Sequence, residues 1–319
     1  MPMSQKWRMM HVARLILVNC ITDEMTAENI AFNGVLVPHM KANYDSEREN
    51  GFKRVFHDDE YSQFSYVFYQ NGMWKDAEDL EYQIVEMGMK EQGMRHASTL
   101  TSMAILARTY SCQGKYKEAG ELQLKVLDLR KIMLGSEHPD TLISMNNLAV
   151  TYSHQGKYEE ALELELEVLD LHTKMLGLDH PETLTSMNNL ASAYSADGKY
   201  EEAGELKLKV LDLCSRVLGL GHPNTLTIMA NLAFTYSVQK KYEEVGELEL
   251  KFMDLSKKVL GPEHPETLTS MNNLACTYLD QGKYEEAREL ALKQAPKTSH
   301  SPHSQEPLHI YVGDENRMI

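Results

Sequence analysis

The stretch HPDTLISMNNLAVTYSHQGKYEEALELELEVLDLHTKMLGLD, residues 138–179, decides the fold, because the chain repeats it every 42 residues. The dipeptide His-Pro recurs at positions 138, 180, 222 and 264, and His96 begins an earlier, degenerate copy. The motif SMNNLA occupies 144–149, 186–191 and 270–275, and KYEEA occupies 157–161, 199–203 and 283–287. A fixed period of this length is typical of an array of stacked structural repeats.

Each copy predicts two antiparallel helices. Pro139 suits the first position of a helix, and apolar residues such as Leu148 then recur at helical spacing, which predicts a helix over about 139–154. Gly156 closes this helix, and a second helix follows and ends at Gly177. One pair cannot bury its own apolar face, so neighbouring pairs must stack. We therefore predict an all-α solenoid of antiparallel helix pairs.

The array is predicted to cover residues 54–295, in six units that begin near 54, 96, 138, 180, 222 and 264. Residues 1–53 are predicted to form an N-terminal helical segment, and residues 296–319 a disordered C-terminal tail. Pro296 interrupts the last helix, and no polar cap follows it. We therefore expect self-association through the uncapped last repeat; the alternative is that the chain is a fragment of a longer array.

These units resemble the tetratricopeptide repeat (TPR). The residues that match its signature in the third unit are Leu148, Ala149, Tyr152, Gly156, Tyr158 and Ala161, and in the fourth Leu190, Ala191, Tyr194, Gly198, Tyr200 and Ala203. The 42-residue period, with HPxT at the start and Leu-Gly at the end, is similar to the kinesin light chain subtype. The resemblance implies a right-handed superhelix and a non-catalytic scaffold or adaptor that binds a peptide or a partner helix in its concave groove.

A second resemblance leaves another function open. Residues 1–53 lack the sustained heptads of the coiled coil by which kinesin light chains bind the motor heavy chain. The stretches 26–29, 35–39 and 61–72 instead resemble the segment that joins the switch domain to the repeats in fungal STAND (NOD-like) receptors. The alternative function is therefore the ligand-sensing repeat region of a STAND-type NTPase receptor. This sequence itself contains no GxxxxGK[ST] phosphate loop.

The resemblance also implies which residues line the groove. In the family, an Asn just before the signature Leu contacts the peptide backbone, and the matching residues are Asn147, Asn189, Asn231 and Asn273, with Ile105 interrupting the row. Further candidate groove residues are Asn146, Asn188, Asn272 and Arg108. An amide both donates and accepts, so such a row can satisfy an extended peptide without reading its sequence. The alternative is that these amides only bond neighbouring helices.

Charge restricts the partner. The chain has 319 residues, with 32 basic against 47 acidic and a net charge of −15, which argues against nucleic acid. In the predicted groove wall of the second to sixth units, the only ionisable residues are Arg108, His154 and Asp280. We therefore predict a neutral or partly apolar peptide ligand. The acidic run 159–170 is predicted to be a solvated outer face.

The remaining motifs argue against chemistry. The histidines that begin the units lie one full repeat apart, so they are predicted to cap helices and not to bind metal. The four cysteines are far apart, which suits a reducing compartment and predicts a cytoplasmic protein. No apolar run approaches the length of a membrane helix. We predict no enzymatic activity, no cofactor and no membrane association.

Overall fold

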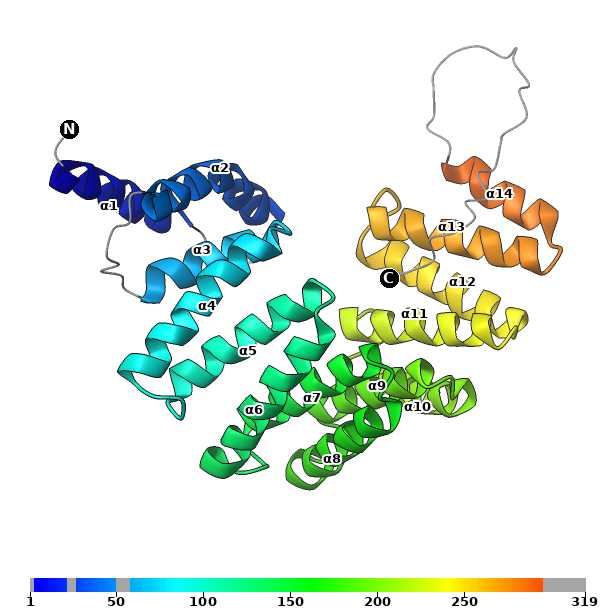
Figure 1. Cartoon of the computed structure of the whole chain (residues 1–319). Coiled ribbons are helices and arrows are strands. Elements are labelled where there is room, and N and C mark those ends of the chain that lie inside the picture. The colour runs from blue at the N-terminus through cyan, green and yellow to red at the C-terminus, as the bar shows by residue number, and fades with distance from the viewer. Residues whose placement is uncertain (1–2, 22–26, 50–57, 295–319) are drawn as a thin grey trace, which may run out of the picture. The chain divides into compact units, whose positions relative to one another are not determined.

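A computed structural model describes residues 3–21, 27–49 and 58–294. Within them it contains fourteen helices and no strand, which confirms the predicted all-α repeat fold (Figure 1). The chain divides into two parts, Met1–Lys240 and Lys241–Ile319, and each is described by itself. The predicted tail at 296–319 and the predicted start of the array near 54 lie outside the described residues.

Helices follow one another along the whole of the first part. They are α1 (Met3–Cys20), α2 (Ala27–Glu49), α3 (Asp58–Gln70), α4 (Trp74–Glu91), α5 (Ala97–Cys112), α6 (Tyr116–Leu134), α7 (Pro139–His154), α8 (Tyr158–Leu176), α9 (Pro181–Ala196), α10 (Tyr200–Val217) and α11 (Pro223–Val238). The second part contains α12 (Tyr242–Val259), α13 (Pro265–Asp280) and α14 (Tyr284–Gln294). From α3 onward, odd-numbered helices are the first, or A, helices of the units, and even-numbered ones are the B helices. From α3 to α11 each helix packs against its neighbours in sequence.

Local chemistry sets the ends of these helices. The predicted histidine caps are confirmed: Nδ1 of His138 accepts a hydrogen bond from the N–H of Asp140 at 3.1 Å, and His180, His222 and His264 make the same contact at 3.2 Å. The turn after α7 places Gly156 at φ 75°, a conformation that glycine adopts without strain. Lys240 takes the same turn position after α11, with φ 60°.

The apolar faces of neighbouring helices form a core that continues from one unit to the next. Leu127 on α6, Leu142, Met145 and Leu148 on α7 and Val168 on α8 make one buried cluster. Full burial of each such side chain stabilises the fold by about 1.5–3 kcal/mol. The cluster draws on both helices of the third unit and one helix of the second, so neither unit has a complete core alone.

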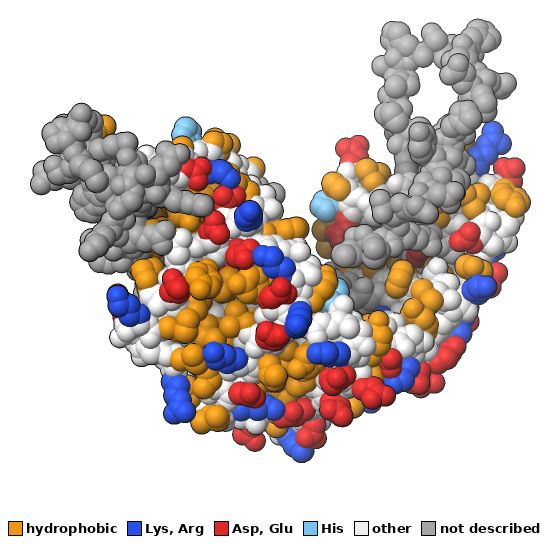
Figure 2. All heavy atoms as spheres, viewed as in Figure 1, with side chains coloured by type: hydrophobic (Ala, Val, Ile, Leu, Met, Phe, Trp, Pro, Cys, Tyr) orange, Lys and Arg blue, Asp and Glu red, His pale blue; other side chains and the backbone are white. Residues whose placement is uncertain are grey.

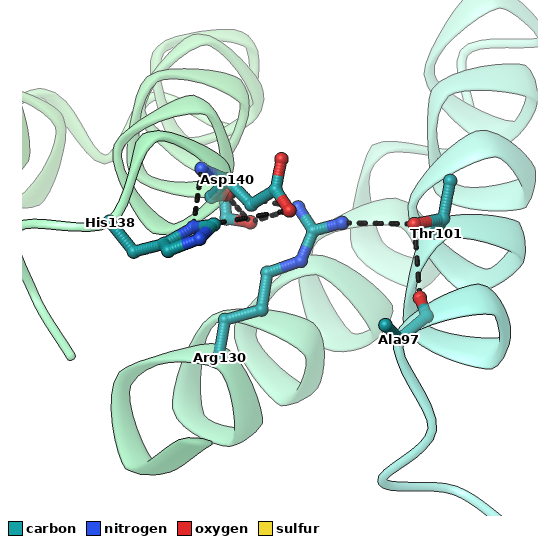
Figure 3. Close-up of polar contacts among 6 residues, drawn as sticks. Ala97, Thr101, Arg130, His138 and Asp140 are labelled. Atoms are coloured by element: carbon teal, nitrogen blue, oxygen red, sulfur yellow. Dashed lines mark hydrogen bonds and ion pairs between the residues drawn. The ribbon is translucent and has the colours of Figure 1, made fainter. Parts of the chain in front are cut away.

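Polar contacts also join the units. The Arg130 guanidinium on α6 donates to the carbonyl of Asp140 at 3.0 Å and to the Ser144 hydroxyl at 2.8 Å, both on α7 (Figure 3). It also reaches the Thr101 hydroxyl on α5 at 3.4 Å. Burial lowers the pKa of Arg130, while the nearby Asp140 carboxylate opposes that shift. Arg130 therefore links the A helices of two consecutive units.

The helices before the repeats pack onto the first unit. Arg14 on α1 forms a buried ion pair with Glu60 on α3, with 2.6 Å between Nε and Oε2. Met40 and Tyr44 on α2 belong to the same hydrophobic cluster as Phe64 on α3. These contacts cover the apolar face of α3 that has no preceding B helix.

Candidate functional site

The A helices share an exposed face. One repeated position, with residues 42 apart, is exposed on four of them: Arg108 on α5, Val150 on α7, Ser192 on α9 and Phe234 on α11. We call the surface that these residues mark the A-helix face; it holds the residues predicted to line the concave wall. On the face seen in Figure 2, acidic side chains gather over α8 and α10, both of which are B helices. Glu163 on α8 and Glu205 on α10 are among the exposed acidic residues of these helices, whereas Arg108 is the one charged residue among the four that mark the A-helix face.

The predicted asparagine row lies on this face. Asn147 on α7 is exposed, and Asn189 on α9 and Asn231 on α11 are half-buried. The backbone carbonyls of Asn147 and Asn231 accept hydrogen bonds from Thr151 and Thr235, the hydroxyls one turn later. Within the described residues, the side-chain amides of these three asparagines form no hydrogen bond to a neighbouring helix. They keep both donor and acceptor groups available.

The other predicted groove residues have different environments. Asn146 and Asn188 are half-buried, and their amide oxygens are enclosed without a hydrogen-bond partner among the described residues. Asn272 and Asn273 are exposed on α13, in the second part of the chain. Arg108 is exposed on α5. The structure of the first part therefore brings Arg108 and the asparagines of α7, α9 and α11 onto one face.

A row of buried polar residues lies on the B helices. It has one member per unit, namely Glu81 on α4, Gln123 on α6, Glu165 on α8 and Lys207 on α10. We call these the floor positions. The prediction that the run 159–170 is a solvated outer face is wrong at Glu165, which is 2% exposed. The reason is that Glu165 shares one helix face with the buried Ala161 and Val168.

Lys207 shows what a floor position contacts. Its ammonium donates to the Thr235 hydroxyl on α11 at 2.7 Å and to the Ser195 hydroxyl on α9 at 3.1 Å. It also lies 3.5 Å from the carbonyl oxygen of Asn231. Burial lowers the pKa of Lys207 to about 8. The floor therefore lies between successive A helices, directly beneath the asparagine row.

Glu165 occupies the same position one unit earlier but lacks such partners. Its Oε2 atom is buried and has no hydrogen-bond partner among the described residues. The residue of α9 at the place of Thr235 is Ala193, which has no hydroxyl to donate. Burial raises the pKa of Glu165 to about 8. The polar floor is therefore satisfied at Lys207 and unsatisfied at Glu165.

A pocket of about 70 Å³ lies where Ile105 interrupts the asparagine row. It is enclosed by α3, α4 and α5, and its lining residues are Ser62, Ser65, Tyr66, Glu81, Ile84, Ser102, Ile105 and Arg108. The Ser65 hydroxyl donates to Oε1 of Glu81 at 2.6 Å, and the Thr109 hydroxyl on α5 also interacts with this carboxyl group. Burial raises the pKa of Glu81, and hydrogen bonding to Ser65 and Thr109 and the charge of Arg108 oppose that shift. The guanidinium carbon of Arg108 lies 4.3 Å from the centroid of the Tyr69 ring.

Sequence reasoning missed both the floor and the pocket. The floor carries a readable signal, because Glu165 follows Ala161 by four residues and precedes Val168 by three, the spacing of one helix face. The pocket carries none, because its residues come from three helices and share no motif.

In the described ranges, no three metal-binding side chains come together and no helix is long and apolar enough to cross a membrane.

Comparisons with known proteins agree with this architecture. A family profile described as the tetratricopeptide repeat matches residues 106–174, 182–248 and 250–293, more than half of the chain. The chain shares 36% sequence identity with a protein of Podosopora anserina that is provisionally named a kinesin light chain. The crystal structure of that protein shows TPR-like repeats that are nearly identical to one another. That match covers 62% of this chain and 94% of the other, with a TM-score of 0.56. No curated protein matches this chain.

More distant structures are similar in fold alone. The chain is 16% identical to BtubC (BKLC) from P. vanneervenii, over 76% of this chain and 99% of that one, with a TM-score of 0.57. It is 15% identical to a STAND protein with a tetratricopeptide repeat sensor from Pyrococcus horikoshii. That match covers 89% of this chain and 43% of the other, with a TM-score of 0.58.

Proposed function

Because the chain belongs to the tetratricopeptide repeat family, we propose that it is a non-catalytic scaffold that holds a neutral, partly apolar peptide or partner helix along the A-helix face. One observation carries the proposal. Asn147, Asn189 and Asn231 recur at one position of three successive A helices, and their amides form no hydrogen bond within the described chain. The row is therefore available to an extended peptide backbone, whose N–H and C=O groups an amide can satisfy together.

The chemistry of the A-helix face supports a ligand of low charge. Beside the asparagine row lie Val150, Ser192 and Phe234, which offer apolar contact and a hydroxyl but no charge. Arg108 is the one exposed cation at this repeated position in the first part of the chain. Binding would then depend on shape and hydrogen bonds, and its affinity would change little with salt.

The test uses peptides of defined origin. Nine-residue peptides are selected from a displayed random library on the purified chain, and the affinity of one selected peptide is measured by fluorescence anisotropy. The triple change Asn147→Ala, Asn189→Ala, Asn231→Ala should weaken binding by about tenfold to a thousandfold, since each lost hydrogen bond contributes about 0.5–1.5 kcal/mol. Helicity should not change.

A matched triple variant controls for general damage. Glu121, Glu163 and Glu205 lie 42 residues apart on the exposed sides of α6, α8 and α10. Their joint replacement by Ala should leave peptide affinity unchanged. Equal loss in both triple variants, or no loss in the asparagine variant, would contradict the groove proposal. A steep fall in affinity with added salt would contradict the uncharged ligand.

The compartment and the sensor alternative are also matters of proposal. All four cysteines are free, and we propose a reducing location such as the cytoplasm. The likeness to the STAND sensor rests on 15% identity and concerns the fold, so it adds no observation that favours a sensor over a scaffold.

A further inference from the structure

We propose that the B helices of the first part form a second docking surface, which binds a basic amphipathic helix of a protein partner. This surface is separate from the A-helix face, so the inference goes beyond the proposed function. Its centre is one repeated position of the B helices, with residues 42 apart, that is apolar and exposed. We call its four members the outer row: Tyr82 on α4, Leu124 on α6, Leu166 on α8 and Leu208 on α10.

Helix formation does not explain why the outer row is apolar. Its side chains are 43–51% exposed, and leucine, lysine, glutamine and glutamate have similar helix propensities. The next position along each helix is charged, as expected of a solvated site, with Lys125, Glu167 and Lys209. Single apolar residues on a surface are common, whereas apolar residues repeated on consecutive helices and rimmed by charges are typical of an interaction site.

The first unit shows that the pattern is more than a copy of one sequence. Helix α4 differs from α6 at most aligned positions. It nevertheless carries Asp79 three residues before Tyr82 and Glu86 four residues after it, where α6 carries Glu121, Leu124 and Asp128. The order acidic, apolar, acidic is therefore kept on a helix whose other residues have changed.

Side-chain contacts place the B helices of consecutive units next to one another. The Lys131 ammonium on α6 lies 3.0 Å from Oε1 of Glu167 on α8. Lys115, directly before α6, lies 2.7 Å from Oε2 of Glu78 on α4. Since the outer row has one residue on each of these neighbouring helices, a single bound helix can contact more than one unit.

Acidic side chains define the charge of the partner. An exposed glutamate precedes each leucine of the outer row by three residues, about one helical turn: Glu121, Glu163 and Glu205. These three form no ion pair within the described residues, whereas Asp170 and Asp212 already pair with Lys174 and Arg216 on their own helices. Figure 2 shows acidic side chains gathered over α8 and α10. Lysine or arginine beside the apolar residues of a partner would pair with the three glutamates.

A helix is the partner that fits this surface. The B helices bond their own backbone groups, so they offer no N–H or C=O to an extended peptide. An amphipathic helix satisfies its own backbone and presents apolar residues in one stripe. A second copy of this chain, with a net charge of −15, would bring acidic groups against acidic groups, and an anionic lipid surface would be repelled as well.

The test uses synthetic helices of defined charge. The probe is a fluorescein-labelled peptide of eighteen leucines and lysines, arranged so that all leucines lie on one helix face, and fluorescence anisotropy measures its binding to the full chain. We expect saturable binding that weakens with added salt. A peptide of the same composition in scrambled order should bind at least about tenfold more weakly, and a leucine–glutamate helix should not bind.

Two triple variants with the same number of exposed apolar residues identify the surface. The joint change of Leu124, Leu166 and Leu208 to Gln should weaken binding of the leucine–lysine helix by about thirtyfold to a hundredfold, because apolar burial is lost. The control changes Met133, Met175 and Val217 to Gln. These residues are 41–45% exposed and lie nine positions later, half a turn around the same helices, so affinity should not change.

A charge variant tests the pairing. Replacing Glu121, Glu163 and Glu205 together by Gln should weaken binding about tenfold at low salt and reduce the dependence on salt. Circular dichroism checks that each variant is folded.

Several results would overturn the inference: no saturable binding, equal affinity for the scrambled or the leucine–glutamate probe, no loss in the leucine variant, or equal loss in both apolar triple variants. Light scattering and sedimentation with phosphatidylserine vesicles test the other occupants. A change of oligomeric state in the leucine variant, or binding of the wild type to the vesicles that this variant loses, would assign the surface to a second copy or to lipid and contradict the basic helix.

Failure of this surface is separable from failure of the groove. The asparagine triple variant should bind the leucine–lysine helix as tightly as the wild type does. If selected peptides depend on the asparagine row but the outer row binds no basic helix, the present inference alone is wrong. If the basic helix binds through the outer row but no peptide depends on the asparagines, the groove proposal alone is wrong.

Discussion

Two interfaces between neighbouring units have the same geometry and opposite chemistry. The interface between α10 and α11, called the 10/11 interface, is polar. Gly204 and Lys207 of α10 face Thr235 and Gln239 of α11. The Gln239 amide donates to the carbonyl of Tyr200 at 2.5 Å. At the interface between α8 and α9, called the 8/9 interface, the corresponding residues are Leu162 and Glu165 on α8 and Ala193 and Asp197 on α9. There Leu162 and Ala193 pack in one apolar cluster with Leu190.

The difference teaches that an apolar set of residues can replace the polar contacts at this place in the repeat. A Cβ atom on Gly204 would lie 3.3 Å from the Tyr236 ring and 3.4 Å from the Gln239 amide nitrogen, so a branched apolar side chain there would crowd both. At the 8/9 interface Leu162 fills that space, and the glutamine is replaced by Asp197, which pairs instead with Lys199 at 2.5 Å. Size alone does not decide the exchange, because at the 4/5 interface, between α4 and α5, Glu78 holds the place of Gly204 and Gln113 still donates to the carbonyl of Trp74 at 2.9 Å.

The largest effect is expected from breaking the apolar set. Leu162→Gly removes a buried side chain and adds a helical glycine, so it should lower the free energy of unfolding by about 4 kcal/mol. Adding Ala193→Thr and Asp197→Gln should recover about 1–2 kcal/mol by building the polar contact of the 10/11 interface. In the wild-type background the same two changes should destabilise, because Leu162 occupies the space. Urea unfolding of all four chains measures this coupling; equal effects in both backgrounds would contradict it.

The second prediction concerns the unsatisfied floor. The folded-state pKa of Glu165, about 8, lies above its ordinary value of 4.5. Its contribution to stability is therefore complete below about pH 4.5 and is lost as the pH rises toward 8. The variant Glu165→Gln carries the same residue as the floor position of α6, Gln123, and cannot ionise. Its free energy of unfolding should therefore exceed that of the wild type by about 2–4 kcal/mol at pH 7. In the wild type, the free energy of unfolding should fall as the pH rises from about 5 to 8. This fall should be absent in Glu165→Gln and present in the control Glu163→Gln, whose substituted residue is exposed.

The contribution of Lys207 to stability should change with pH in the opposite direction and at higher pH. Its folded-state pKa of about 8 lies below the ordinary 10.5, so its contribution is present above pH 10.5 and is lost as the pH falls to 8. In Lys207→Met, the hydroxyls of Thr235 and Ser195 still donate to carbonyls of their own helices. The variant should therefore stay within about 2 kcal/mol of wild type at pH 7. Its unfolding free energy should lack the rise that wild type shows between pH 8 and 10.5.

The smallest effect belongs to the turns. Lys240 adopts φ 60°, where Gly198 at the equivalent turn has φ 79°. Lys240→Gly should stabilise the chain by about 1 kcal/mol, and Gly198→Lys should cost about as much, because only glycine adopts this conformation without strain. Thermal melts compare the two variants, and a loss of stability in Lys240→Gly would contradict the assignment.

The repeat made most of the fold predictable. The period placed Pro139 and His154 at the ends of α7, and the histidine caps followed from the helix-start chemistry of His138. The acidic run of α8 made the prediction wrong at Glu165, because the exposed Glu163 and Glu167 flank this residue and hide that it lies on the buried face. Helical spacing alone could have separated them.

The site was only partly predictable. Placement of Asn147, Asn189 and Asn231 on one face follows from the period, because equal spacing gives equal orientation. The pocket at Glu81 and Arg108 depends on how three helices pack, and no local pattern encodes that packing. Whether the asparagine amides bind a ligand remains a prediction that a direct observation must test.

The most direct test labels the asparagine side chains themselves. The full chain, with ¹⁵N only in asparagine, is titrated with a peptide selected from the random library, and the side-chain amide signals are followed. The account predicts that the signals of Asn147, Asn189 and Asn231 shift together and give the same affinity as the anisotropy measurement. The signals of two control residues, Asn33 on α2 and Asn71 directly after α3, should not shift. Binding of the peptide with no change at the three row signals would contradict the central claim.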